Sequence, residues 1–143
     1  MADTTHKGYT ASAATALSTD LNALANNTAS AASSAIDNTT NLDLYADFEL
    51  VLGTTSSRTA GCVVSLYITP SLDGTNYADV SSSSAELLGV FPLATGTGAA
   101  RVIIRDCPIP PALFKVFVVN SSTQALNASG NTVKYRAHSV KTV

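Results

Sequence analysis

The chain has 143 residues, enough for one domain whose core needs no metal or disulfide to hold it together. Charged residues make up only 13% of the sequence and hydrophobic residues 45%, so the chain is expected to fold and not to remain disordered. The net charge of −2 and the scattered Lys and Arg residues argue against a nucleic-acid binder, because such proteins need a basic surface to displace counterions from phosphates.

The sequence also carries no sign of a membrane or of export. No run of 18 apolar residues predicts a membrane span, and the N-terminus lacks the basic and apolar regions of a secretory signal. Cys62 and Cys107 are therefore predicted to be reduced, buried thiols, with a disulfide between neighbouring strands as the alternative. Their spacing is that of neither a zinc site nor a redox motif, so no metal or cofactor is expected.

The first forty residues differ from the rest, since they are rich in Ala, Ser, Thr and Asn and poor in large apolar groups. Within them Leu17, Leu21 and Leu24 fall at i, i+4 and i+7, which predicts one face of a short helix. A three-turn helix is marginal alone and has to dock on something. We therefore predict two parts: an N-terminal arm over 1–40, with this helix and a flexible connector, and a β-domain over 41–143.

Period-two alternation begins after the arm. In residues 41–52 it divides the side chains into an apolar set and a mostly polar set: Leu42, Leu44, Ala46, Phe48, Leu50 and Leu52 against Asp43, Tyr45, Asp47, Glu49 and Val51. Residues 62–69 alternate in the same way, and Pro70 ends that strand because proline cannot donate to a ladder. Further short strands are predicted over 87–93, 101–106, 113–120 and 132–143.

About seven short strands joined by turn residues indicate an all-β fold, an antiparallel β-sandwich. No strand alternates with a long amphipathic helix, which excludes a parallel α/β fold. The pattern does not separate a jelly roll from an immunoglobulin-like sandwich. Because the chain has no Trp to pack against an immunoglobulin-type disulfide, the jelly-roll-like form is favoured.

The residues give little support for catalysis or for a metal. His138 falls on the polar face of the last strand and is predicted to be a surface residue, and no Ser or Cys lies in a nucleophile motif. Asp43, Asp47 and Glu49 are interpreted as one solvated strand face. Asp73, Asn76 and Asp79 surround an Asp-Gly turn, but the alternating oxygens and closing Glu of a calcium loop are missing. The chain is therefore not expected to be an enzyme.

A carbohydrate-binding face is the strongest alternative that the residues themselves suggest. Sugars often stack on exposed aromatic rings of β-sandwiches, and the candidates by strand phase are Tyr45, Tyr67 and Tyr77. Cross-strand pairing with neighbouring side chains explains the same tyrosines equally well.

The order of four segments resembles a known group of proteins. SLYITPSLDGTNYAD, LLGVFPL, IPPALFKVFVVN and ASGNTVKYRAHSV, which span much of 42–143, are similar to segments of small virion proteins of tailed bacteriophages, in particular head decoration (cement) proteins. The resemblance implies a structural protein on the capsid surface of a virion assembled in the host cytoplasm. It also implies a homotrimer whose partner is the major capsid protein.

This resemblance turns the candidate residues into a contact hypothesis. Leu17, Leu21 and Leu24 would anchor the arm to a capsid subunit or a neighbouring protomer, while the loop and strand residues Tyr67, Asp73, Asn76 and Tyr77 would form an exposed contact surface. Low charge and a hydroxyl-rich surface suit such close packing. The alternatives are a tail or baseplate accessory protein and a glycan-binding module or adhesin.

Overall fold

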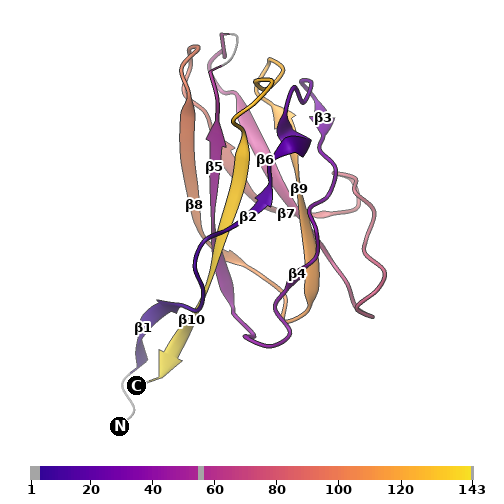
Figure 1. The fold of residues 1–143 in the computed structure, drawn as a ribbon, viewed down its shortest axis with the longest axis vertical. Helices are drawn as coiled ribbons and strands as arrows, with labels where there is room; N and C mark the ends of the chain where they lie inside the picture. The colour runs from indigo at the N-terminus through magenta and orange to yellow at the C-terminus, as the bar shows by residue number, and fades with distance from the viewer. Residues whose placement is uncertain (1–3, 55–56, 143) are drawn as a thin grey trace.

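A computed structural model describes residues 4–54 and 57–142, with side chains from residue 8 to residue 140. The chain folds into two five-stranded antiparallel sheets that lie face to face in a sandwich-like arrangement (Figure 1). The predicted all-β class is therefore confirmed. Among the described residues no helix is long and apolar enough to cross a membrane.

The first sheet, sheet A, has the strand order β1-β10-β5-β8, and β2 pairs with β10 as well. Its strands are β1 (Thr4–Tyr9), β2 (Ala14–Leu17), β5 (Tyr45–Leu52), β8 (Ala100–Pro108) and β10 (Thr132–Thr142). The second sheet, sheet B, has the order β3-β9-β6-β7, and β4 pairs with β9. Its strands are β3 (Thr28–Ala29), β4 (Ile36–Asp37), β6 (Val63–Pro70), β7 (Glu86–Pro92) and β9 (Leu113–Ser121).

The core lies between the two sheets and follows the predicted alternation. In β5 every second residue is buried, starting with Ala46, and in β6 the buried set starts with Val64. The first two residues predicted for the apolar face, Leu42 and Leu44, lie before β5 and are each 54% exposed. Cys62 and Cys107 are both buried and both free thiols, as predicted.

The predicted helix over Leu17–Leu24 is wrong. Leu17 ends β2, and the next residues form only a 3-10 turn, η1 (Thr19–Leu21). Ala23 then has a φ of 54°, in the left-handed region that a right-handed helix does not visit. Leu17 and Leu21 are almost completely buried, and Leu24 packs against the same core. Each of the three leucines therefore reaches the core from a different local structure and not from one helix face.

Residues 4–40 are built into the two sheets, so the predicted division at residue 40 is not a structural boundary. β1 and β2 extend sheet A beside β10, whereas β3 and β4 extend sheet B beside β9. Side chains strengthen the second junction: the buried hydroxyls of Ser30 and Ser33 accept the backbone N–H groups of Val118 and Val116, each at 3.1 Å. The connector between the sheets is therefore tightly held.

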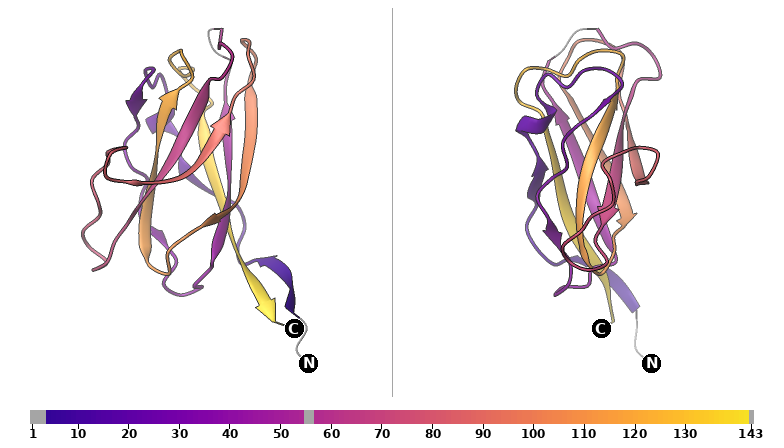
Figure 2. Two further views of the ribbon diagram at one scale, coloured as in Figure 1. Left: turned by 180° about the vertical axis from the view of Figure 1, so that it is seen from behind. Right: turned by 90° about the vertical axis from the view of Figure 1, so that its right-hand side faces the viewer.

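The opposite side of the sandwich brings β7 and β8 together. Gly89 in β7 lies so close to β8 that a Cβ atom there would sit 2.5 Å from Cδ1 of Ile104. A larger residue at position 89 would therefore require the end of the Ile104 side chain to move. Between β6 and β7 the chain makes a long excursion over residues 71–85, which stands away from the sheets in the left view of Figure 2.

At one end of the molecule β1 and the last part of β10 continue past the other strands as a two-stranded ribbon (Figure 1). The pairing runs from Tyr9 opposite His138 to Thr4 opposite Thr142. An isolated two-stranded ribbon is marginally stable, so whatever fixes its base determines how firmly it is held.

Candidate functional site

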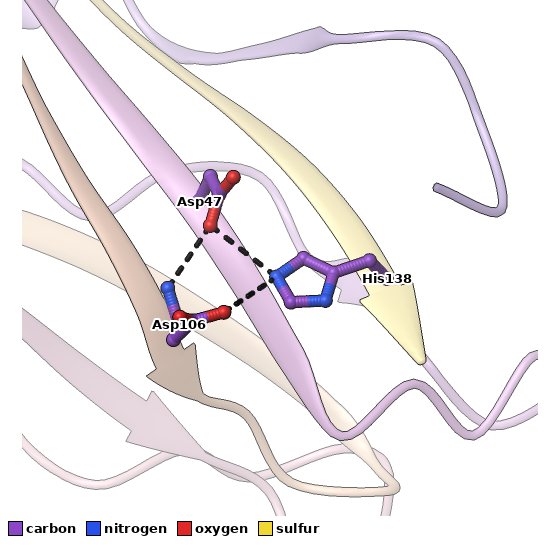
Figure 3. Close-up of side chains that lie close together, drawn as sticks. All are labelled: Asp47, Asp106 and His138. Atoms are coloured by element: carbon purple, nitrogen blue, oxygen red, sulfur yellow. Dashed lines mark hydrogen bonds and ion pairs between the residues drawn. The ribbon is translucent and has the colours of Figure 1, made fainter. Parts of the chain in front are cut away.

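Three side chains from three strands of sheet A converge at the base of this ribbon. His138 comes from β10, Asp47 from β5 and Asp106 from β8 (Figure 3). The Nε2 atom of His138 lies 3.3 Å from Oδ1 of Asp47 and 3.4 Å from Oδ1 of Asp106. One nitrogen and two carboxylate oxygens within 4.8 Å of one another form a group that can hold a metal ion. We call this group the DDH cluster.

An irregularity in strand pairing brings Asp106 to the cluster. The register between β5 and β8 shifts between Ala46 and Phe48, so the stretch around Asp106 bulges opposite Asp47. Asp106 has a φ of 56°, a conformation that Asp tolerates better than most residues. Its backbone N–H donates to Oδ1 of Asp47 at 2.9 Å, which ties the bulge to the neighbouring strand.

The prediction that His138 is an ordinary surface residue is wrong. Its side chain does point to the outer face of sheet A, but the residue is only 2% exposed. The ring of Tyr45 stacks on it with centroids 5.8 Å apart, and the ring of Tyr9 stands edge-on at 5.6 Å. Its Nδ1 atom is buried and has no hydrogen-bond partner among the described residues.

Tyr9 also fixes the carboxylate of Asp47. Its hydroxyl donates to Oδ2 of Asp47 at 2.7 Å, and the guanidinium of Arg136 lies 3.9 Å above the Tyr9 ring. Burial raises the pKa of Asp47, but hydrogen bonds from Tyr9, the Asp106 N–H and His138 outweigh it, so this pKa lies below its ordinary value. The hydrogen bond to Asp47 in turn raises the pKa of Tyr9. Asp47 is therefore an ionised acceptor at neutral pH.

A shallow hollow of about 250 Å³ opens beside the cluster on the outer face of sheet A. Tyr9 and Asp47 line it together with three basic residues, Arg105, Lys134 and Arg136. Glu49 lines it as well, so the hollow combines two acidic residues with three basic ones.

The expected solvated face of Asp43, Asp47 and Glu49 is wrong in part. Asp43 is only 2% exposed, and its carboxylate accepts hydrogen bonds from the hydroxyls of Thr10 at 2.6 Å and Ser139 at 2.9 Å. Glu49 behaves more as expected, since it is half-buried and lies 3.3 Å from the exposed guanidinium of Arg101. The two aspartates thus hold the N-terminal segment against β10.

The leucines predicted to anchor an arm do not form a surface. Leu17 and Leu21 are 1% and 0% exposed and lie in the core, and Leu24 is half-buried against it. They are needed for the fold, and no partner can reach the first two without disrupting it.

The remaining predicted contact residues do lie on or near the excursion between β6 and β7. Asp73 and Asn76 are exposed, and Tyr77 is half-buried with the Lys115 ammonium 4.3 Å from its ring centre. Tyr67 is half-buried in β6, where it stacks on Phe117 at 5.2 Å. A hollow of about 420 Å³ is lined by Asp73, Asn76 and Tyr77 together with Pro70, Leu72 and Ala78.

The turn at Asp73 has a structural explanation. Its carboxylate accepts hydrogen bonds from the backbone N–H and side-chain amide of Asn76 and from the N–H of Thr75, and these lower the pKa of Asp73 well below its usual range. Gly74 follows with a φ of 76°. The oxygens that a calcium ion would use are therefore already engaged in closing the turn.

The tyrosines proposed for sugar stacking do not share a platform. Tyr45 belongs to sheet A and stacks on His138, whereas Tyr67 belongs to sheet B and stacks on Phe117. Both point to outer faces, but these faces lie on opposite sides of the sandwich.

Comparison with known proteins adds no family assignment: no family model matches this sequence, and no curated protein is significantly similar to it. The chemistry of the site must therefore be argued from its geometry. Sequence reasoning missed the DDH cluster because its three residues are far apart in the chain. Asp47 and Asp106 are 59 positions apart, and His138 follows Asp106 by 32 positions. Only the order of the strands in sheet A brings them together. Arg105 and Asp106, adjacent charges at the end of an apolar strand, were the one local signal.

Proposed function

We propose that this protein is a structural component of a bacteriophage virion, a decoration protein that binds the outer surface of the head. The observation that carries the proposal is the order of the strands, which supports a jelly roll. The chain has eight strand positions when β1 and β2 are counted as one position and β3 and β4 as another. The first position pairs with the last (β1 and β2 with β10), and the second with the seventh (β3 and β4 with β9). The third pairs with the sixth (β5 with β8), and the fourth with the fifth (β6 with β7).

This nested pairing is what results when one long antiparallel hairpin is rolled into two sheets. Jelly rolls of this kind recur in viral capsid proteins and in lectins. Fold alone does not set function, so the proposal also needs a surface suited to binding. The resemblance of residues 42–143 to phage decoration proteins selects the virion role over the lectin role.

The contact surface that we propose is the excursion over residues 71–85 with the adjoining strand β7. It presents apolar side chains to solvent: Leu72 is fully exposed at 102%, Leu87 is 52% exposed, and Val80 and Val90 are 44% and 38% exposed. The exposed Asp73 and Asn76 and the half-buried Tyr77 add polar groups around the hollow beside Leu72. Apolar centres with polar rims are typical of protein–protein interfaces.

The test uses shells that lack the protein and asks whether the purified chain binds them. Wild type is expected to bind at a fixed ratio and to appear at local threefold positions when the decorated heads are imaged. Leu72→Asp should weaken binding at least tenfold, because it places a charge at the centre of the contact. Leu44→Asp changes an exposed leucine outside residues 71–92 in the same way, so it is the matched control and should bind normally.

Two results would contradict the proposal. One is a protein that sediments only with tails, which supports the tail or baseplate alternative. The other is saturable binding to a glycan array that Tyr67→Ala abolishes, which supports the adhesin alternative. Solution mass adds a separate check, since the homotrimer that we propose would have three times the 14.7 kDa mass of the chain.

Deletion of residues 1–40 is not a test of capsid binding. The truncation would remove Leu17 and Leu21 from the core and leave one edge of β9 and one edge of β10 without their partner strands. Loss of binding would then report loss of the fold.

A further inference from the structure

The contacts of His138 in the DDH cluster are unusual for a buried side chain. Hydrogen bonds between charged groups are usually about 2.7–2.9 Å long. The Nε2 atom of His138 instead lies 3.3 Å from Asp47 and 3.4 Å from Asp106, almost equally far from both oxygens. The other ring nitrogen has no partner among the described residues. Nε2 therefore has no close partner on the side of the cluster, and poorly paired buried polar groups cost free energy.

The same distances fit a metal ion placed between the three atoms. When ligand nitrogen and oxygen atoms bind a tetrahedral ion at about 2.0–2.1 Å, two of them lie about 3.3–3.4 Å apart. The two separations from Nε2 match two edges of such a tetrahedron, and the two carboxylate oxygens lie within 4.8 Å of each other. The side chain of Asp106 is 49% exposed, so water can reach the cluster from its side. One ion would therefore have three protein ligands and an open position.

The surroundings hold the ligands in this arrangement. Oδ2 of Asp47 accepts the Tyr9 hydroxyl, so its Oδ1 is directed towards the cluster. The rings of Tyr9 and Tyr45 fix the plane of His138. The bulge holds Asp106 at a φ of 56°, a conformation that is less favourable than ordinary strand geometry. Outer partners that orient metal ligands in this way are a regular part of metal sites.

We propose that Asp47, Asp106 and His138 form a binding site for one divalent transition-metal ion of the zinc class. One imidazole nitrogen with two carboxylate oxygens suits zinc and its neighbours, whereas magnesium and calcium prefer oxygen ligands alone. The ion joins β5, β8 and β10 at the base of the terminal ribbon and so stiffens the ribbon. The inference rests on the DDH cluster and not on the proposed virion role, so either can fail alone.

The experiment uses the full-length protein, freed of metal by dialysis against a chelator and titrated with zinc chloride by calorimetry. We expect one ion per chain, no comparable heat with magnesium or calcium chloride, and a higher Tm with zinc. Asp106→Asn should weaken zinc binding at least tenfold, because an amide oxygen replaces a carboxylate ligand. Asn tolerates the positive φ of residue 106, and the side chain is half-exposed, so this variant is expected to fold.

Two controls separate this site from other zinc ligands. Asp20→Asn removes an exposed carboxylate in η1 and should leave affinity unchanged. His6→Gln tests the second histidine of the chain and should also leave it unchanged. Nitrogen-15 NMR adds a readout of His138: zinc on Nε2 places the ring proton on Nδ1. Absence of saturable binding, wild-type affinity in Asp106→Asn, or a His138 ring that is unaffected by zinc would each overturn the proposal.

Discussion

The outer face of each sheet buries an aromatic side chain. On sheet A this side chain contacts ionisable groups, and on sheet B it contacts another aromatic ring. On sheet A the ring is His138, covered by Tyr9 and Tyr45 and facing two carboxylates. On sheet B it is Phe117, which is completely buried although it points away from the core, and which stacks on Tyr67. Each face also carries one cation above a tyrosine ring, Arg136 over Tyr9 and Lys115 over Tyr77.

The comparison shows that burial on an outer face does not dictate one kind of interaction. Sheet B stabilises its ring by removing apolar area from water, and this contribution does not depend on pH. Sheet A stabilises its ring through groups that ionise, so its contribution changes with pH and with bound cations. Four substitutions or treatments separate the two cases.

The largest effect is expected from Phe117→Ala on sheet B. Truncation of a fully buried Phe typically lowers the free energy of unfolding by about 3–5 kcal/mol, through lost burial and the cavity that remains. Urea denaturation should show this loss equally at pH 5 and pH 8. A loss under about 1 kcal/mol would mean that the ring is not buried in solution.

The next effect concerns the thiol of Cys107. This residue follows Asp106 of the DDH cluster in sheet A, whereas Cys62 directly precedes β6 of sheet B. Burial, followed by the negative charges of Asp47 and Asp106, raises the pKa of Cys107 from 9.0 to about 11. A thiol whose pKa is raised by folding contributes stability below its unfolded pKa, and this is lost as the pH rises towards 11. At pH 8 we expect a thiol reagent to label Cys107 many times more slowly in the native protein than in urea. Fast native labelling at pH 8 would contradict this.

A smaller effect is expected from Tyr9→Phe in metal-free protein. The Asp47 pKa is lowered by folding, so the contribution of Asp47 is present above about pH 4 and is lost as the pH falls through the folded value. Without the Tyr9 hydroxyl the pKa should rise, and stability should fall by less than about 1 kcal/mol at pH 7 with little change at pH 2. Carboxyl NMR titration measures the pKa, and Tyr67→Phe on sheet B is the control that should leave it unchanged.

The smallest effect is expected from Lys115→Met, which keeps most of the apolar stem and removes the charge above Tyr77. An exposed cation–π contact contributes about 0.5–1 kcal/mol. Urea denaturation of wild type, Lys115→Met, Tyr77→Leu and the double variant gives the coupling energy between the two residues. A coupling energy of zero would show that the ammonium and the ring do not interact in solution.

The sequence predicted those strands whose burial follows directly from alternation. In β5 and β6 each second side chain enters the core, and nothing else competes for that face, so Phe48 and Val64 could be placed from the pattern. The same reasoning failed for Leu17, Leu21 and Leu24. Helical spacing predicts a helix only when one element carries all three residues. Here Leu17 ends a strand, Leu21 ends a 3-10 turn, and a left-handed residue, Ala23, precedes Leu24.

The DDH cluster could not be predicted for a different reason. Alternation placed His138 correctly on the outer face, but strand phase does not tell what covers that face. The cover is Tyr9, which lies near the other end of the chain and pairs directly with His138 across β1 and β10. The position of Asp106 depends on a bulge, and no pattern of residue types in the sequence signals its register shift.

The pairing of β1 with β10 also bears on how the protein is made. The ribosome produces β1 to β4 well before their partners β9 and β10. Until then Leu17 and Leu21 have no core to enter, and the nascent chain must keep these segments apart from other copies. Pairings this distant in sequence make closure slow, because the loop entropy is lost before the contacts form. The sandwich can therefore close only once β9 and β10 have been made and can pair with the first four strands.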